Sequence, residues 1–267
     1  MKIVRSFRCL AVAAAVAVLV AGCASSGSEG VQLRGDKKTS SETAGELNKQ
    51  LGTEYLKKGN LQLAKEKLER AEKYNPRDPE IHSVLAVLYD RLGIPEEVDK
   101  HFSEAIRLAP KDPQISNNYG AFLCKNGRYE EGVRRFVASA LNPLYRTPEF
   151  AYTNAGVCLR DAKRYDEAAN SFTHALQIRP NYGEAVLQAA DLAFDRGDTV
   201  KARGLLDKYL GTFEATPELL SLGVRVARKQ GDRVVEDKYM RRLRVEYPNS
   251  PQYRELNQSA GTPPHTG

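Results

Sequence analysis

The chain has 267 residues, with 40 Lys or Arg against 34 Asp or Glu, and its formal net charge is +6. Lys2, Arg5 and Arg8 stand at the extreme N-terminus, which leaves the rest of the chain with a surplus of only +3. This small, dispersed surplus argues against nucleic-acid binding, which needs a clustered basic face.

The first 22 residues have the pattern of a secretory signal peptide. Three basic residues precede a run from Leu10 to Val20 that contains only Ala, Val and Leu. Such a run is too short to cross a bilayer, which takes about 20 apolar residues, but it fits the apolar core of a secretory signal. The alternative is a buried N-terminal helix, which the absence of a capping pattern disfavours.

Cys23 stands where this apolar run meets a polar segment. Residues 20–23, Val-Ala-Gly-Cys, resemble a bacterial lipobox. The resemblance implies that the Cys23 sulfur receives a diacylglycerol and that its amino group is freed and acylated. Ala24 and Ser25 follow in place of the aspartate that retains lipoproteins at the inner membrane. The implied location is therefore the periplasmic face of the outer membrane in a Gram-negative bacterium.

The segment at 23–44 is predicted to be the lipidated cysteine followed by a flexible tether. It is rich in Ser, Gly and charged residues and shows no hydrophobic period. About 20 flexible residues have a root-mean-square reach of about 25 Å. The tether would let the folded body stand away from the bilayer.

From Gly45 onward the chain repeats with a period of about 34 residues. The recurring positions match the tetratricopeptide pattern, L-G-x2-Y … A-x3-F-x2-A … P. One window runs two residues long, and the last is degenerate. The windows are approximately 45–78, 79–112, 113–148, 149–182, 183–216 and 217–250.

This pattern predicts an all-α fold, a right-handed superhelical tetratricopeptide solenoid of about six helix-turn-helix repeats over 45–250. The small residue after the leucine lets the first helix approach the second, and the apolar stripe of the second helix faces the core. One helix pair cannot bury its stripe alone, so neighbouring pairs must stack. The tail at 251–267 loses the period, and we expect it to be largely disordered.

No motif of an enzyme, a cofactor site or a metal site stands out. The sequence contains no G-x-S-x-G, phosphate-binding loop, G-x-G-x-x-G or H-E-x-x-H. The four histidines are far apart in the sequence and lack ligand spacing: His82, His101, His174 and His265. A peptidoglycan-active enzyme would need a separate catalytic domain of about 100 residues, and the repeats leave no room for one.

Two cysteines lie in the repeats. Cys124 and Cys158 fall in the first helices of the third and fourth windows, which are adjacent. In an oxidising compartment we predict a disulfide between them, provided that their Cα atoms come within about 7 Å. The alternative is two buried thiols that act as small apolar side chains.

A row of amides is predicted to line the groove of the solenoid. Position 6 of the first helix is an amide in four of six repeats, and the other two carry Val84 and Leu222. Amides donate and accept hydrogen bonds, so this row would bind the backbone of an extended peptide; the alternative is that the amides only face water. The amides are Gln50, Asn118, Asn154 and Gln188, with Asn117 beside them.

A second candidate surface is apolar. Leu56, Val84 and Val87 fall at groove positions that are polar elsewhere in the chain. An exposed apolar patch of this kind would suit a partner strand or helix. The alternative is that the tether or the neighbouring repeat covers these side chains.

Several segments resemble the type IV pilus biogenesis and stability lipoproteins of the PilF/PilW type. The resemblance spans about 45–250, and its most specific parts are N-N-Y-G-A-F-L-C at 117–124 and N-A-G-V-C at 154–158. It implies a pilotin, a scaffold that helps pilus secretin subunits reach the outer membrane and multimerise, and so supports pilus assembly and twitching motility. It implies no particular binding residue.

The expected partners are therefore secretin subunits, together with the outer membrane through the N-terminal lipid, and neither a nucleic acid nor a small-molecule substrate. An alternative is a periplasmic tetratricopeptide adaptor for another envelope machine, such as β-barrel assembly or cell-wall synthesis.

Overall fold

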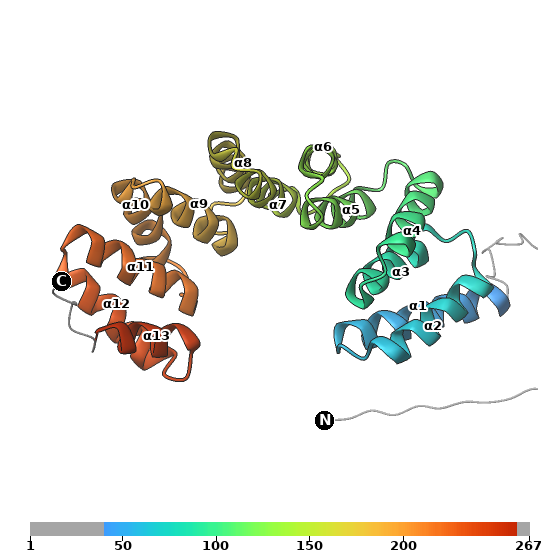
Figure 1. The fold of residues 1–267 in the computed structure, drawn as a ribbon, viewed down its shortest axis with the longest axis horizontal. Helices are drawn as coiled ribbons and strands as arrows, with labels where there is room; N and C mark the ends of the chain where they lie inside the picture. The colour runs from blue at the N-terminus through green and yellow to red at the C-terminus, as the bar shows by residue number, and fades with distance from the viewer. Residues whose placement is uncertain (1–39, 261–267) are drawn as a thin grey trace, which may run out of the picture. The chain divides into compact units, whose positions relative to one another are not determined.

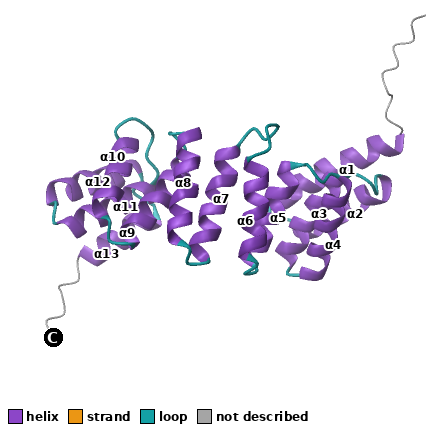
Figure 2. Ribbon diagram, turned by 90° about the horizontal axis from the view of Figure 1, so that it is seen from above, coloured by secondary structure: helices purple, strands orange, loops and turns teal. Residues whose placement is uncertain are grey.

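The computed structural model describes residues 40–260, which form thirteen helices and no strand within that range. Figures 1 and 2 show helices joined by short loops and stacked in chain order. No helix among these residues has both the length and the apolar character needed to cross a bilayer. The helices are α1 (Ser40–Lys57), α2 (Leu61–Tyr74), α3 (Pro79–Leu92), α4 (Pro95–Leu108), α5 (Pro113–Lys125), α6 (Tyr129–Ala140), α7 (Pro148–Asp161), α8 (Tyr165–Ile178), α9 (Gly183–Asp195), α10 (Thr199–Leu210), α11 (Pro217–Gln230), α12 (Arg233–Glu246) and α13 (Pro251–Ala260).

The ends of the helices follow from local sequence. Asp78 and Asp112 cap α3 and α5, each accepting two backbone N–H groups through its carboxylate. The prolines that follow, Pro79 and Pro113, suit the first helical position because no partner is required there for their missing N–H. Gly93 ends α3 with a φ of 72°, a left-handed conformation that costs glycine little.

Each helix pair is packed around one large side chain from its even-numbered helix. The facing position on the odd-numbered helix is small: a Cβ on Gly52 would lie 2.6 Å from Cγ of Leu68. Burying each large side chain contributes about 1.5–3 kcal/mol. These side chains, all at most 2% exposed, are Leu68, Phe102, Phe136, Phe172, Leu206 and Tyr239.

The predicted tetratricopeptide solenoid is confirmed. Its six pairs run from α1–α2 to α11–α12, and each helix contacts only the next one or two helices along the chain. The pair that lacked a clear sequence pattern, α11–α12, is packed like the others, with Tyr239 filling the position that Phe102 has in the second pair.

The N-terminal boundary differs from the expected one, because 40–44 is helical rather than part of a tether. This additional turn of α1 is held by the C-terminal end of α2: Nδ2 of Asn75, which follows the helix, donates to the Glu42 carbonyl at 3.1 Å, and Ser41 Oγ donates to the carbonyl of Tyr74, its last residue, at 3.3 Å. The signal peptide, Cys23 and the tether as far as residue 39 lie outside the described residues.

The C-terminal tail also differs from the expectation, because 251–260 forms α13. Leu256 on this helix is 6% exposed and lies in the same apolar core as α11. The Oγ of Ser250 accepts a hydrogen bond from the backbone N–H of Tyr253 at 3.2 Å and so caps the helix start. The helix covers an apolar surface of the last repeat, so its sequence lacks the tetratricopeptide period.

Candidate partner-binding face

The odd-numbered helices from α1 to α11 form one continuous face of the solenoid. The backbone of each approaches that of the next odd-numbered helix to within 8 Å between Cα atoms, whereas the backbones of neighbouring even-numbered helices from α2 to α12 stay farther apart. Figure 1 shows α5 and α7 on one side of the stack and α6 and α8 on the other. The stack is tighter on the odd-numbered side, which we therefore call the inner face.

Two of the predicted groove amides bridge neighbouring helices of the inner face. Nδ2 of Asn118 on α5 donates to Ser83 Oγ on α3 at 3.4 Å, and Nδ2 of Asn154 on α7 donates to Asn117 Oδ1 on α5 at 3.2 Å. Asn117 is only 3% exposed, so the prediction that it faces an open groove is wrong. Its side chain lies between the two helices and holds Asn154 in place.

The other two amides are held only within their own helices. Nε2 of Gln50 donates to Glu46 at 3.0 Å, and Nε2 of Gln188 donates to Glu184 at 2.8 Å. Among the described residues, Oε1 of Gln188 is buried and has no hydrogen-bond partner. A buried acceptor without a donor costs about 1–3 kcal/mol.

The predicted apolar patch is not an exposed surface. Leu56 is 5% exposed and belongs to the core of the first two repeats. Val84 and Val87 are partly buried and pack against the same core. The neighbouring repeat covers them because α1 and α3 are in contact, so the patch is corrected to core packing.

Cys124 and Cys158 are joined by a disulfide, with 5.6 Å between their Cα atoms. Cys124 lies on α5 and Cys158 on α7, so the bridge links two adjacent helices of the inner face. It closes a loop that includes the longer connection between the third and fourth repeats.

Ion pairs also link the inner-face helices, and the sequence analysis missed them. Asp191 on α9 pairs with Arg160 on α7 at 3.1 Å and with Arg225 on α11 at 3.4 Å. Lys125 on α5 pairs with Asp90 on α3 at 2.8 Å. The partners lie 31, 34 and 35 residues apart, so a search for opposite charges one repeat apart would have found them.

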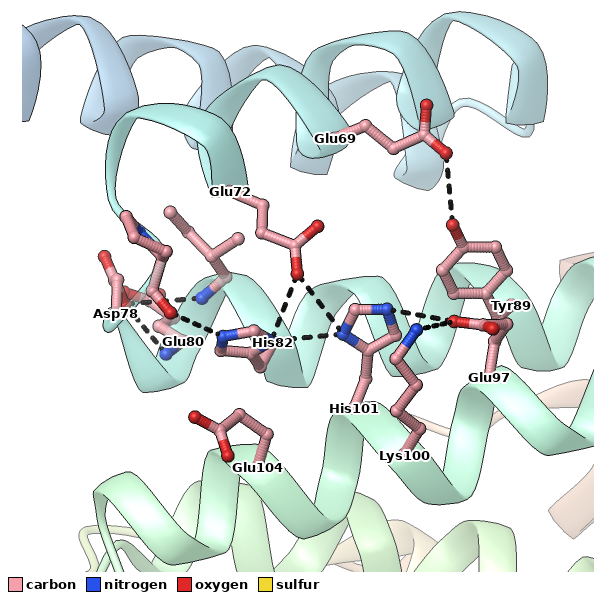
Figure 3. A network of polar contacts seen from close by, with 12 residues as sticks. Glu69, Glu72, Asp78, Glu80, His82, Tyr89, Glu97, Lys100, His101 and Glu104 are labelled. Atoms are coloured by element: carbon pink, nitrogen blue, oxygen red, sulfur yellow. Dashed lines mark hydrogen bonds and ion pairs between the residues drawn. The ribbon is translucent and has the colours of Figure 1, made fainter.

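The structure also brings together two histidines that the sequence separates. Nδ1 of His82 on α3 and Nδ1 of His101 on α4 are 3.1 Å apart, and Glu72 on α2 lies beside them (Figure 3). The wide separation of the four histidines along the chain gave no indication of this contact. Burial, with smaller effects from His82 and Lys100, lowers the pKa of His101 to about 4, so this imidazole is neutral at pH 7.

Comparison with protein families gives three matches to tetratricopeptide repeats, over residues 49–97, 101–134 and 159–223. Repeats of this kind generally serve as binding scaffolds and not as catalysts.

Comparison with individual proteins extends the similarity over most of the chain. The type IV pilus assembly protein PilF of Pseudomonas aeruginosa is 30% identical over 241 residues, which cover 90% of this chain and 94% of PilF. The solved structure of P. aeruginosa PilF is similar with a TM-score of 0.66 and 28% identity, over 82% of this chain and 99% of that one. The crystal structure of PilW, a type IV pilus biogenesis factor, gives a TM-score of 0.68 and 25% identity, over 80% and 98% of the two chains.

Proposed function

Because the chain belongs to the family of the tetratricopeptide type IV pilus assembly protein PilF, we propose that it is a pilotin for the type IV pilus secretin. In this role it escorts secretin subunits to the outer membrane and promotes their multimerisation, and so supports pilus assembly and twitching motility. The observation that carries the proposal is the similarity to PilF over 90% of the chain.

The proposed anchor is a lipid on Cys23 at the periplasmic face of the outer membrane. Its support is the Val-Ala-Gly-Cys sequence at 20–23, behind a basic segment and an apolar run. A single acyl chain gives only marginal attachment, whereas the three chains of a mature lipoprotein hold it permanently. An anchored scaffold raises the local concentration of its partner, so modest contacts are sufficient for function.

The proposed contact surface is the inner face, and the proposed ligand is an extended segment of the secretin subunit. The amides of Gln50, Asn118, Asn154 and Gln188 lie on this face at the same position in four repeats. The Oε1 of Gln188 is an acceptor that a backbone N–H of the bound segment would satisfy. Backbone recognition of this kind places few demands on the side chains of the partner.

The test is complementation of a deletion strain with the wild-type chain, with Cys23→Ser and with Cys9→Ser as the matched control. Cys9 lies upstream of the lipobox. We expect the deletion and Cys23→Ser to reduce denaturant-resistant secretin multimers and twitching, and Cys9→Ser to restore both. The readouts are immunoblots of secretin, membrane fractionation and twitching zones.

Two results would contradict the proposal. Normal secretin multimers in the deletion strain would rule out the pilotin role. A general loss of outer-membrane β-barrel proteins or of cell-wall integrity would instead assign the protein to another envelope assembly machine.

A further inference from the structure

Three metal-ligating side chains converge where α2, α3 and α4 meet. Their ligand atoms, one each from Glu72, His82 and His101, all lie within 4.8 Å of one another. The two imidazole Nδ1 atoms are 3.1 Å apart, and Oε1 of Glu72 is 3.7 Å from the first and 4.0 Å from the second. Figure 3 shows the carboxylate of Glu72 pointing toward both rings.

The surroundings of His82 determine which of its nitrogens carries the proton. Its Nε2 lies 2.9 Å from the carbonyl oxygen of Pro76, and a carbonyl can only accept, so Nε2 donates. The Nδ1 of the neutral ring is then an unprotonated lone pair directed at His101. A hydrogen bond from the far nitrogen to a carbonyl is the arrangement that orients metal-binding histidines in general.

His101 is oriented by two further contacts. Its Nε2 faces the carboxylate of Glu97 at 3.6 Å, which favours a proton on that nitrogen. Its ring stacks on Tyr89, with 5.3 Å between centroids and 9° between planes. With the proton on Nε2, both Nδ1 atoms are acceptors facing each other at 3.1 Å, and they need a proton or a cation between them.

The spacing of the three ligand atoms suits zinc. Two imidazole nitrogens bound to one tetrahedral zinc ion, each about 2.0–2.1 Å from it, lie about 3.3–3.4 Å apart, which is within about 0.3 Å of the 3.1 Å between the two Nδ1 atoms. The carboxylate of Glu72 has only to shift inward, and its side chain is 34% exposed and free to do so. Two imidazoles with one carboxylate favour zinc over magnesium or calcium, which prefer oxygen ligands.

We propose that Glu72, His82 and His101 bind one zinc ion, which ties the first repeat to the second. Glu72 belongs to the last turn of α2, whereas the histidines belong to α3 and α4. The fourth coordination position is left to water on the side of the partly exposed Glu72. Binding to the folded chain alone stabilises it in proportion to the logarithm of the zinc concentration.

The competing interpretation is a direct hydrogen bond in which Nδ1–H of His101 donates to Nδ1 of His82. The two interpretations differ in their response to zinc and to removal of the carboxylate. If the histidine pair holds no metal, zinc does not raise the melting temperature, and Glu72→Gln does not change how the chain responds to zinc. If the three residues form a metal site, zinc raises the melting temperature and Glu72→Gln weakens zinc binding.

The experiment uses the full chain, stripped with a chelator and with free thiols alkylated so that Cys9 and Cys23 do not compete. Zinc affinity is measured by competition with a chromophoric chelator, and thermal unfolding is followed with zinc or with magnesium. The absorption spectrum of the wild-type chain loaded with cobalt reports the coordination geometry of the site. We expect one zinc per chain, a higher melting temperature with zinc and no change with magnesium.

Three variants locate the site. Glu72→Gln preserves shape at a partly exposed position and is expected to weaken zinc binding at least tenfold. His101→Gln is expected to abolish it, and His174→Gln, at an exposed histidine on α8, should bind as the wild type does. The proposal is overturned if no saturable one-to-one zinc binding occurs at micromolar zinc, or if Glu72→Gln and wild type bind equally.

Discussion

The amide of Asn154 on α7 donates a hydrogen bond to Oδ1 of Asn117 on α5, with 3.2 Å between the two atoms. The same two helices carry the Cys124–Cys158 disulfide. A polar contact and a covalent bond therefore fix the junction between the third and fourth repeats.

Replacing Asn154 should destabilise the fold more than replacing an exposed amide. In Asn154→Ala the buried oxygen of Asn117 loses its donor, which costs about 1–3 kcal/mol. Gln50→Ala is the control, because Gln50 is exposed and bonds only to Glu46 in its own helix, and it should change the free energy of unfolding by less than about 0.5 kcal/mol. Urea denaturation measures both; equal effects would contradict the role given to the Asn117–Asn154 bond.

Removing the two amides that bond only within their own helices should weaken partner binding without unfolding the chain. For Gln50→Ala with Gln188→Ala we expect about tenfold weaker binding of the secretin subunit, because two hydrogen bonds of about 0.5–1.5 kcal/mol each are lost. Calorimetry with purified subunit measures this. The control is Thr173→Ala with Gln177→Ala, at two exposed positions of α8; similar losses in both double variants would exclude the inner face as the contact surface.

Loss of the disulfide should lower stability substantially. The bridge spans 34 residues, and closing a loop of that length restricts the unfolded chain by about 3–4 kcal/mol. We expect Cys124→Ala with Cys158→Ala to lower the free energy of unfolding in urea by that order. Reductant should destabilise the wild type and leave the double variant unchanged. A difference below about 1 kcal/mol would mean that the bridge adds little to the fold.

Acid should destabilise the metal-free chain through His101. Its pKa is about 4 when folded, mainly because it is buried, against the ordinary value of 6.5, so the unfolded state binds the proton first. The stability is therefore complete above pH 6.5 and is lost as the pH falls toward 4, by roughly 3 kcal/mol in total.

The test of this pH dependence is urea unfolding between pH 7 and 4.5 in the presence of chelator. The groups that face His101 are Glu72, His82, Tyr89, Glu97 and Lys100. We expect His101→Gln to flatten the profile and His174→Gln to leave it unchanged. Identical profiles for wild type and His101→Gln would assign the acid sensitivity to other groups.

The last helix should be part of the cooperative fold. Leu256→Ala removes a side chain that is 6% exposed within the core around α11, and we expect a loss of about 2–3 kcal/mol. Glu255→Ala, at an exposed position of the same helix, is the control. If Leu256→Ala has the same free energy of unfolding in urea as the wild type, α13 is not part of the cooperative fold.

The repeat period was sufficient to predict the fold because each recurring position has one physical task. Gly52 faces Leu68, and the same small-to-large relation recurs at Gly156 and Phe172. These contacts lie within a helix pair, where spacing along the chain determines spacing in space. The positions of Cys124 and Cys158 could be compared for the same reason, because adjacent repeats place equivalent residues side by side.

The features that the sequence analysis missed depend on the direction in which individual side chains point and on the segment that follows the last repeat. Asn117 and Asn118 are neighbours in the sequence, yet one is buried and the other partly exposed; the periodic pattern alone did not reveal this. His82 and His101 come from two helices of the second repeat and lie beside Glu72 of the first repeat. No short sequence motif therefore contains all three residues. The helix α13 follows the last repeat and covers it, so its sequence does not follow the repeat pattern.

The restriction of contacts to near neighbours along the stack has a mechanical consequence. A pull on one end of the solenoid passes through each joint in series, and the most compliant joint yields first. The joint crossed by the cystine cannot open, so elastic extension is confined to the joints on either side of it. The molecule then behaves as two springs separated by a rigid block.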